Sequence, residues 1–144
     1  MVKSTLAAIA LAVALIFPLS IHAQNSPGER TPEEVVKHHL DAFMRHDVDA
    51  ILSDYADDAI FLAPNQTVQG KAALRKMFES FAANKNAPDF KVKVTADGDV
   101  GYEHWVANPG KPNSVSGTDA FVVRHGKILF HTVLLTQRGN TNQQ

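Results

Sequence analysis

Apolar residues recur along this chain with two periods, one typical of helices and one typical of strands. Spacings of three and four residues predict helices that begin after Thr31, over residues 48–55 and over residues 71–83. The first helix has strong start signals, because Thr31 is a good N-cap and Glu34 can complete a capping box with it. The inward stripes of the three helices comprise Val36, His39, Leu40 and Phe43, then Ile51, Leu52 and Tyr55, then Leu74, Met77, Phe78 and Phe81.

Alternation of apolar and polar residues, which is typical of half-buried strands, dominates the second half of the chain. It predicts strands over residues 90–95 and 100–107, then a closing hairpin over residues 116–135 with Gly126 in its turn. A smaller hairpin over residues 59–69 precedes the third helix. Helices followed by an antiparallel meander predict an α+β fold, in which the helices pack on one face of a bent sheet and close an apolar pocket.

A carboxylate interrupts the apolar face of the closing hairpin. Asp119 shares one strand face with Phe121 and Val123, because side chains alternate along a strand. Burial of an unpaired carboxylate is costly and raises its pKa toward a neutral, proton-donating form. Asp119 is therefore either a pocket carboxylate or, alternatively, a residue on a solvated face or one bound to a backbone amide.

His39 lies inside the apolar stripe of the first helix. One interpretation is a core histidine satisfied by a single hydrogen bond. The other is a pocket donor or base, for which the ordinary histidine pKa near ~6.5 is well suited. The pattern alone leaves both interpretations open.

The N-terminal residues predict an export signal that is not part of the fold. Lys3 gives a positive start, residues 6–19 are almost wholly apolar, and Ala23 suits the cleavage position. The apolar run is too short for a stable membrane span, although an uncleaved N-terminal anchor is the alternative. We expect a periplasmic or secreted protein, organised as a signal peptide over residues 1–23, a linker over 24–30, the domain over 31–138 and a polar tail over 139–144.

Composition narrows the possible functions. The 144 residues are enough for one domain, and the formal net charge of −1 provides no attraction for nucleic acid. The absence of cysteine excludes a disulfide framework and thiol catalysis. His38 and His39 are adjacent and point to different sides of their helix, and no other set has ligand spacing, so we expect neither a metal nor another cofactor.

Two segments resemble the nuclear transport factor 2-like superfamily, and its SnoaL-like, ketosteroid isomerase-like branch in particular. They are residues 47–59 (DVDAILSDYADDA) and residues 117–128 (GTDAFVVRHGKI), supported by Pro64, Gly70 and Trp105. The resemblance implies a cone-shaped fold with three N-terminal helices packed on a curved, mainly antiparallel sheet. It identifies the fold better than the activity, because this scaffold carries isomerases, cyclases, epoxide hydrolases, dehydratases and non-enzymatic binders.

The resemblance also assigns site residues. Asp119 falls in the motif that carries the oxyanion-hole aspartate of the ketosteroid isomerases, a carboxylic acid held neutral in an apolar site. His39 falls where those enzymes have a tyrosine donor, and His131 falls where the last strand lines the pocket. Their catalytic base, an aspartate before a proline, is replaced here by Ala63, which cannot accept a proton.

Two classes of function follow from these residues. The first is an exported acid–base enzyme of the isomerase or cyclase type, in which His39 or His131 is the base and Asp119 is the acid or orients a histidine. Its substrate would be a small apolar molecule. The second is a non-catalytic protein that binds a hydrophobic ligand or a partner, and a homodimer is expected in either case. The residues expected to contact the ligand are Phe43, Tyr55, Trp105 and Phe121.

Overall fold

A computed structural model of the protein describes residues 28–84 and 88–138. The predicted signal peptide, most of the predicted linker and the predicted polar tail lie outside the described residues. Within them, no helix is both long enough and apolar enough to cross a membrane.

Three helices form where the apolar periodicity predicts them, with one difference in length. The first begins with the expected capping box, in which the Thr31 hydroxyl accepts from the Glu34 amide and the Glu34 carboxylate accepts from the Thr31 amide. Asp47 caps the second helix through the Ala50 amide. The helices are α1 (Pro32–Met44), α2 (Val48–Ser53) and α3 (Lys71–Ala82).

Six strands form one curved sheet in the order β2-β1-β6-β5-β4-β3. The last four strands build the predicted antiparallel meander, and β1 and β2 build the predicted small hairpin. Only β1 and β6 pair in parallel within the described sheet. The strands are β1 (Tyr55–Ala63), β2 (Gln66–Gln69), β3 (Phe90–Asp97), β4 (Val100–Ala107), β5 (Val115–Arg124) and β6 (Lys127–Arg138).

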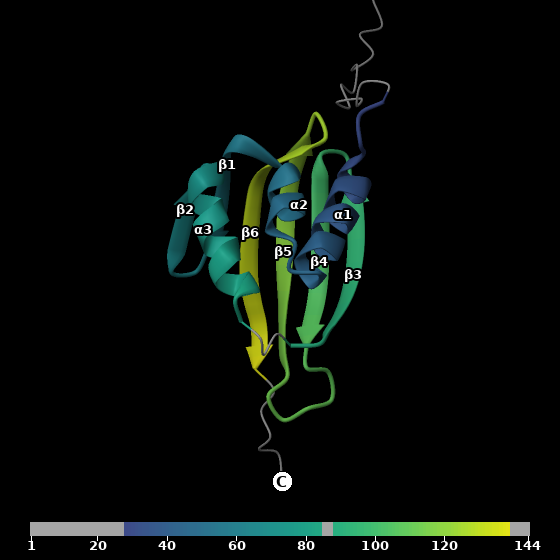
Figure 1. The fold of residues 1–144 in the computed structure, drawn as a ribbon. Helices are drawn as coiled ribbons and strands as arrows, with labels where there is room; N and C mark the ends of the chain where they lie inside the picture. The colour runs from purple at the N-terminus through teal and green to yellow at the C-terminus, as the bar shows by residue number, and fades with distance from the viewer. Residues whose placement is uncertain (1–27, 85–87, 139–144) are drawn as a thin grey trace, which may run out of the picture.

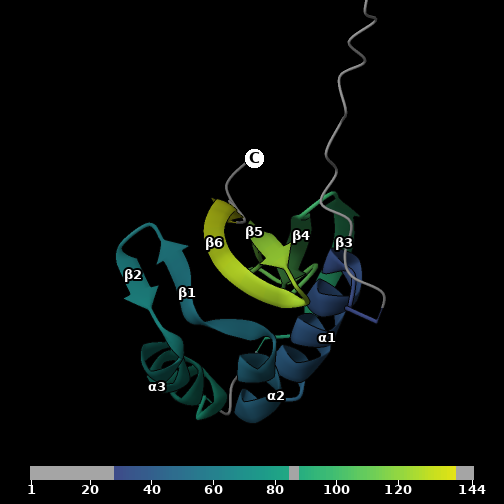
Figure 2. The same cartoon turned by 90° about the horizontal axis from the view of Figure 1, so that it is seen from above.

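The helices cover one face of the sheet (Figure 1), and the sheet curls around that face without closing into a barrel (Figure 2). Register shifts in the β5–β6 pairing and in the β1–β6 pairing accompany the curvature, because an irregular ladder bends a strand. The main core lies between the layers, where Val35, Ile51, Leu74, Phe121 and Ile128 are fully or almost fully buried. The α+β architecture is the one that the sequence predicts.

The second helix is shorter than expected, and the prediction that it includes Tyr55 is wrong. It ends at Ser53, and Tyr55 is instead the first residue of β1. The physical reason is a contact with the far end of the chain, since the Asp54 carbonyl accepts a hydrogen bond from the Ile128 amide at 2.7 Å. Tyr55 is paired with Ile128 in the parallel ladder and is still fully buried, so its side chain points inward as predicted.

Candidate functional site

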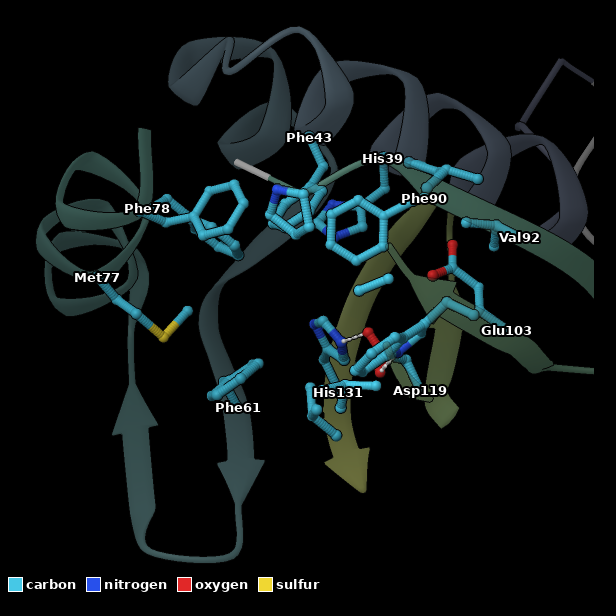
Figure 3. A pocket seen from close by; sticks show the side chains of 17 residues that line it. His39, Phe43, Phe61, Met77, Phe78, Phe90, Val92, Glu103, Asp119 and His131 are labelled. Carbon is cyan, nitrogen blue, oxygen red and sulfur yellow. Dashed lines mark hydrogen bonds and ion pairs between the residues drawn. The ribbon is translucent and has the colours of Figure 1, made fainter. Parts of the chain in front are cut away.

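A pocket of about 390 Å³ lies between α1, α3 and the concave face of the sheet (Figure 3). Most of its wall is apolar, and the polar groups gather where β4, β5 and β6 meet. Such a cavity is typical of sites for small apolar molecules that carry few polar groups. It is lined by His39, Leu40, Phe43, Phe61, Met77, Phe78, Phe81, Pro88, Phe90, Val92, Glu103, Trp105, Ala107, Val115, Asp119, His131 and Val133.

Asp119 is the centre of the polar wall. Strand alternation turns it inward with Gly117 and Phe121, as the sequence predicts, and 15% of its side chain remains exposed. Its Oδ1 accepts from the Trp105 indole N–H at 2.8 Å, and its Oδ2 lies 3.2 Å from Nε2 of His131. An ionised carboxylate has about four lone-pair sites, so Asp119 retains acceptor capacity for a ligand.

His131 is held from both sides. Its Nδ1 lies 2.6 Å from the hydroxyl of Tyr55, and its Nε2 faces Asp119. Burial, followed by the charges of Asp119 and Glu103, keeps the pKa of Tyr55 well above its ordinary value, so the phenol keeps its proton and donates it to Nδ1. Because a carboxylate only accepts, Nε2 of His131 carries a proton and donates to Asp119.

Glu103 lies directly across from Asp119 on the neighbouring strand. It is only 4% exposed, and its Oε1 is buried without a hydrogen-bond partner among the described residues. Burial and then the nearby Asp119 charge raise the pKa of Glu103 from 4.5 to about 8. At neutral pH the wall thus pairs a protonated carboxyl group at Glu103 with the hydrogen-bonded carboxyl group of Asp119.

Sequence reasoning missed Glu103, although strand alternation contained a signal for it. Glu103 has the same parity on β4 as Trp105, which was expected to contact the ligand. Once Trp105 is assigned to the pocket, the alternation assigns Glu103 to the pocket as well. Figure 3 shows Glu103 beside Asp119, with Met77 and Phe78 on the opposite side.

His39 forms part of the helical wall of the pocket. Its ring packs edge-on against Tyr55, Phe121 and His131 at centroid distances of 5.4, 5.6 and 5.6 Å. Its Nδ1 is buried without a partner among the described residues. Burial, and then the neighbouring His131, hold the pKa of His39 well below its ordinary value, so the ring is a neutral donor or acceptor.

The pocket brings together most of the residues that the sequence singles out. His39, Phe43, Trp105, Asp119 and His131 line it, whereas their catalytic and binding roles stay predictions. Asp119 lies in the pocket lining, and its hydrogen-bond partners are Trp105 and His131.

Two residues that the sequence predicts as ligand contacts lie outside the lining of the pocket. Tyr55 and Phe121 are not among the residues that line the cavity, although both pack against His131, which does line it. Tyr55 donates to the inner side of His131, and the ring of Phe121 lies 4.2 Å from the His131 ring. These two residues support the site from behind, and they do not form its surface.

Ala63, where the related isomerases have their base, lies outside the pocket lining. No group of three or more histidine, aspartate or glutamate side chains in residues 28–84 and 88–138 is arranged to hold a metal ion. The titratable side chains of the described pocket lining are Glu103, Asp119 and the two histidines, His39 and His131.

Comparison with known proteins places this geometry in a family. The SnoaL-like domain model matches residues 36–131, whereas no curated protein matches. Among solved structures, an NTF-2 like protein of unknown function from Burkholderia xenovorans LB400 is similar at a TM-score of 0.64 and 18% identity, over 77% of this chain and 87% of that one. A candidate ketosteroid isomerase from Kribbella flavida DSM 17836 is similar at 0.60 and 14%, over 78% and 83%.

A third solved structure is an LEH-like epoxide hydrolase of M. tuberculosis, similar at a TM-score of 0.56 and 18% identity, over 73% of this chain and 82% of that one. At such identities these structures establish the fold and not the reaction. The family model covers most of the described domain and includes the four polar residues of the pocket, His39, Glu103, Asp119 and His131. The chain therefore belongs to the SnoaL-like domain family and has the nuclear transport factor 2-like fold.

Proposed function

We propose that this protein is an acid–base enzyme that moves a proton at a carbon next to a carbonyl group in a small apolar molecule. The observation that carries the proposal is the buried Oε1 of Glu103, which has no hydrogen-bond partner in the described part of the chain, beside Asp119. Two neighbouring titratable groups whose environments separate their protonation states are the usual arrangement for acid–base work at neutral pH.

In this proposal Glu103 is the acid and Asp119 is the base. The protonated Glu103 donates a hydrogen bond to the substrate carbonyl oxygen and stabilises the negative charge that develops there. Asp119 takes the proton from the adjacent carbon and returns it to another position. His131 acts as a positioning residue, because its Nε2–H orients the Asp119 carboxylate. The neutral His39 ring contacts the substrate as donor or acceptor.

Hydrogen–deuterium exchange tests this function without knowledge of the natural substrate. The probe is 2-tetralone, a neutral apolar ketone, whose α-proton signals are followed by NMR in deuterated buffer. The wild-type protein should accelerate exchange, and Asp119→Asn should lower that acceleration roughly 10²-fold or more, the usual contribution of a proton-transfer group. Glu103→Gln should cause a smaller loss, since an amide still donates a hydrogen bond.

The matched control is Asp58→Asn, which changes an exposed carboxylate of β1 outside the pocket and should leave exchange unchanged. The proposal is wrong if the wild-type protein binds 2-tetralone but exchanges its protons no faster than Asp119→Asn does.

A non-catalytic ligand carrier is the second candidate. It is favoured by Ala63 at the position of the missing base and by the complete occupation of both His131 nitrogens by Tyr55 and Asp119. A carrier would retain an apolar ligand through purification, visible by native mass spectrometry and lost on denaturation. It would give no exchange with any ketone that binds.

We further propose that the mature protein is exported to the periplasm or secreted, and that it forms a homodimer. The apolar N-terminal run and Ala23 support cleavage, and the family resemblance supports dimerisation. N-terminal sequencing of protein from an exporting host should begin at Gln24. Light scattering should give twice the chain mass, and a concentration-independent monomer would remove the dimer from the proposal.

A further inference from the structure

The pocket has an excess of acidic groups over basic ones. Its described lining contains two carboxyl groups, Glu103 and Asp119, and no lysine or arginine. Of the two histidines that line it, His39 adds no positive charge, because burial holds its pKa well below its ordinary value, and His131 is already hydrogen-bonded to Tyr55 and Asp119. An anionic ligand would therefore meet repulsion in a poorly solvated space.

No lysine or arginine of the described pocket lining pairs with the carboxyl group of Glu103. β5 contributes Asp119, which is acidic, and β3 contributes Val94 as its directly paired neighbour. α1 contributes His39 and β6 contributes His131 to the same pocket. An unpaired buried acceptor is a cost that a ligand can remove by donating to it.

A continuous aromatic wall leads to this acidic end. The Phe43 ring stacks on Phe81 at 4.2 Å and meets Phe90 edge-on at 6.0 Å, and Phe90 meets Trp105 edge-on at 5.9 Å. Trp105 in turn donates to Asp119. Aromatic faces attract organic cations, and the attraction is strongest where water is excluded.

We propose that the pocket also binds lipophilic ammonium ions, with the charged nitrogen against Glu103 and Asp119 and the apolar body along the wall formed by Phe81, Phe43, Phe90 and Trp105. Such ligands compete with neutral ketones for the same space. The proposal rests on the pocket of the proposed function but not on its reaction, since binding needs no proton transfer to or from carbon.

Binding of an ammonium ion is linked to the ionisation of Glu103. At pH 7 the carboxyl group is mostly protonated, because its pKa is about 8. A cation beside it favours the carboxylate, and the released proton passes to the buffer. A neutral ligand of the same shape causes no such release.

Three probes that share one ring system but differ in charge separate the effect of ligand charge from that of ligand shape. They are 2-naphthylmethylammonium, 2-naphthylmethanol and 2-naphthoate. Isothermal titration at pH 7, in two buffers of different ionisation enthalpy, gives both the affinity and the protons released. We expect the ammonium ion to bind roughly tenfold or more tightly than the alcohol, with about one proton released per ligand. The carboxylate should bind more weakly than the alcohol.

Glu103→Gln is the decisive variant, because the amide has the same shape and cannot ionise. It should retain alcohol binding, which also shows that the pocket is folded, and it should lose both the proton release and most of the ammonium preference. Naphthoate binding as tightly as the ammonium ion overturns the proposal, as does ammonium binding with no proton release in the wild-type protein. If the protein exchanges ketone protons but does not prefer the ammonium ion, the proposed function stands and this inference is rejected. If it prefers the ammonium ion but does not exchange ketone protons, this inference stands and the proposed function is rejected.

Discussion

Glu103 keeps its proton in the folded protein far above the pH at which the unfolded chain would lose it. Its pKa rises from 4.5 to about 8, chiefly because burial penalises the charged form. Below pH 4.5 the group is protonated in both states. Between 4.5 and 8 only the folded state retains the proton, so the stabilisation that it contributes falls as the pH rises through this window.

The first prediction concerns this pH dependence. Between pH 5 and pH 9, the wild-type protein should lose on the order of 2–4 kcal/mol of unfolding free energy relative to Glu103→Gln. Urea unfolding of both proteins at the two pH values measures the difference, and titrations shared by both proteins cancel. Parallel pH profiles for the two proteins would show that Glu103 ionises normally in the fold.

The second prediction concerns the hydroxyl group of Tyr55. Tyr55→Phe removes the donor to Nδ1 of His131 and leaves that buried nitrogen unsatisfied, so it should lower the unfolding free energy by about 1–3 kcal/mol. The matched control is Tyr102→Phe, which removes the same group from a side chain that is 41% exposed. That control should change the unfolding free energy by less than about 0.5 kcal/mol. Equal effects of the two substitutions would show that the hydrogen bond between Tyr55 and His131 adds no stability.

At the scale of the elements, the pairing of β4 with β5 determines where the indole lies. Trp105 is directly opposite Gly117, and a Cβ atom at that glycine would lie 2.3 Å from Cζ2 of the indole and 2.8 Å from the Leu134 carbonyl oxygen. The indole ring therefore occupies the space that the side chain of any residue other than glycine would fill at position 117. This close approach brings the indole N–H to Asp119, one inward position further along β5.

The third prediction follows from that approach. Gly117→Ala should displace the indole, break its hydrogen bond to Asp119 and lower the unfolding free energy by about 1–3 kcal/mol, the usual effect of overpacking. Trp105 is the single tryptophan of the chain, so its fluorescence reports the displacement directly. Thr118→Ala changes the opposite face of the same strand and should leave the emission unchanged. An unshifted emission spectrum in Gly117→Ala would show that the ring is not held against β5.

The same pair of strands explains why Glu103 was difficult to predict. β4 carries Tyr102 and His104 on one face and Glu103 and Trp105 on the other, so aromatic character does not distinguish the buried face. The structure exposes Tyr102 and His104 and turns Glu103 inward. By contrast, Asp119 could be singled out because it shares its face of β5 with the apolar residues Phe121 and Val123, which are buried.

At the scale of the whole molecule, one polar cluster ties the start of the domain to its last hairpin. We call it the N-terminal clasp, and it comprises Arg30, His38, Asp54 and the carbonyl group of Gly126. The fully buried Asp54 accepts from Arg30 at 2.7 Å and lies 2.8 Å from Nδ1 of His38. Arg30 also donates to the Gly126 carbonyl at 3.2 Å.

The fourth prediction tests the clasp. Arg30→Met should lower the unfolding free energy by about 1–3 kcal/mol, because it removes a donor from a buried carboxylate while His38 remains. Arg45→Met is the matched control, since Arg45 forms only exposed ion pairs with Asp41 and Asp47, which contribute at most about 1 kcal/mol. Urea unfolding compares the two variants, and an equal loss in both would show that the clasp adds no stability.

The parts of the architecture that depend on residues close together in the sequence could be predicted. The helix starts, the small hairpin and the meander each depend on neighbouring residues, and the structure confirms them. The clasp and the parallel pairing of β1 with β6 depend on residues distant in the chain. The spacing of apolar residues along the sequence therefore does not predict them. For this reason Tyr55 was assigned to a helix, although its burial was predicted correctly.

The position of β6 has a consequence for how the chain is made. The last strand to be synthesised lies between β1 and β5 and is the only described strand that joins the β1–β2 hairpin to the rest of the sheet. Before Lys127 and the residues after it leave the ribosome, the nascent chain has neither a continuous sheet nor His131 to complete the pocket. Pairing between such distant segments is slow, so the sheet is completed late in folding. The continuous sheet and the complete pocket therefore form together, and neither can form before β6 has been synthesised.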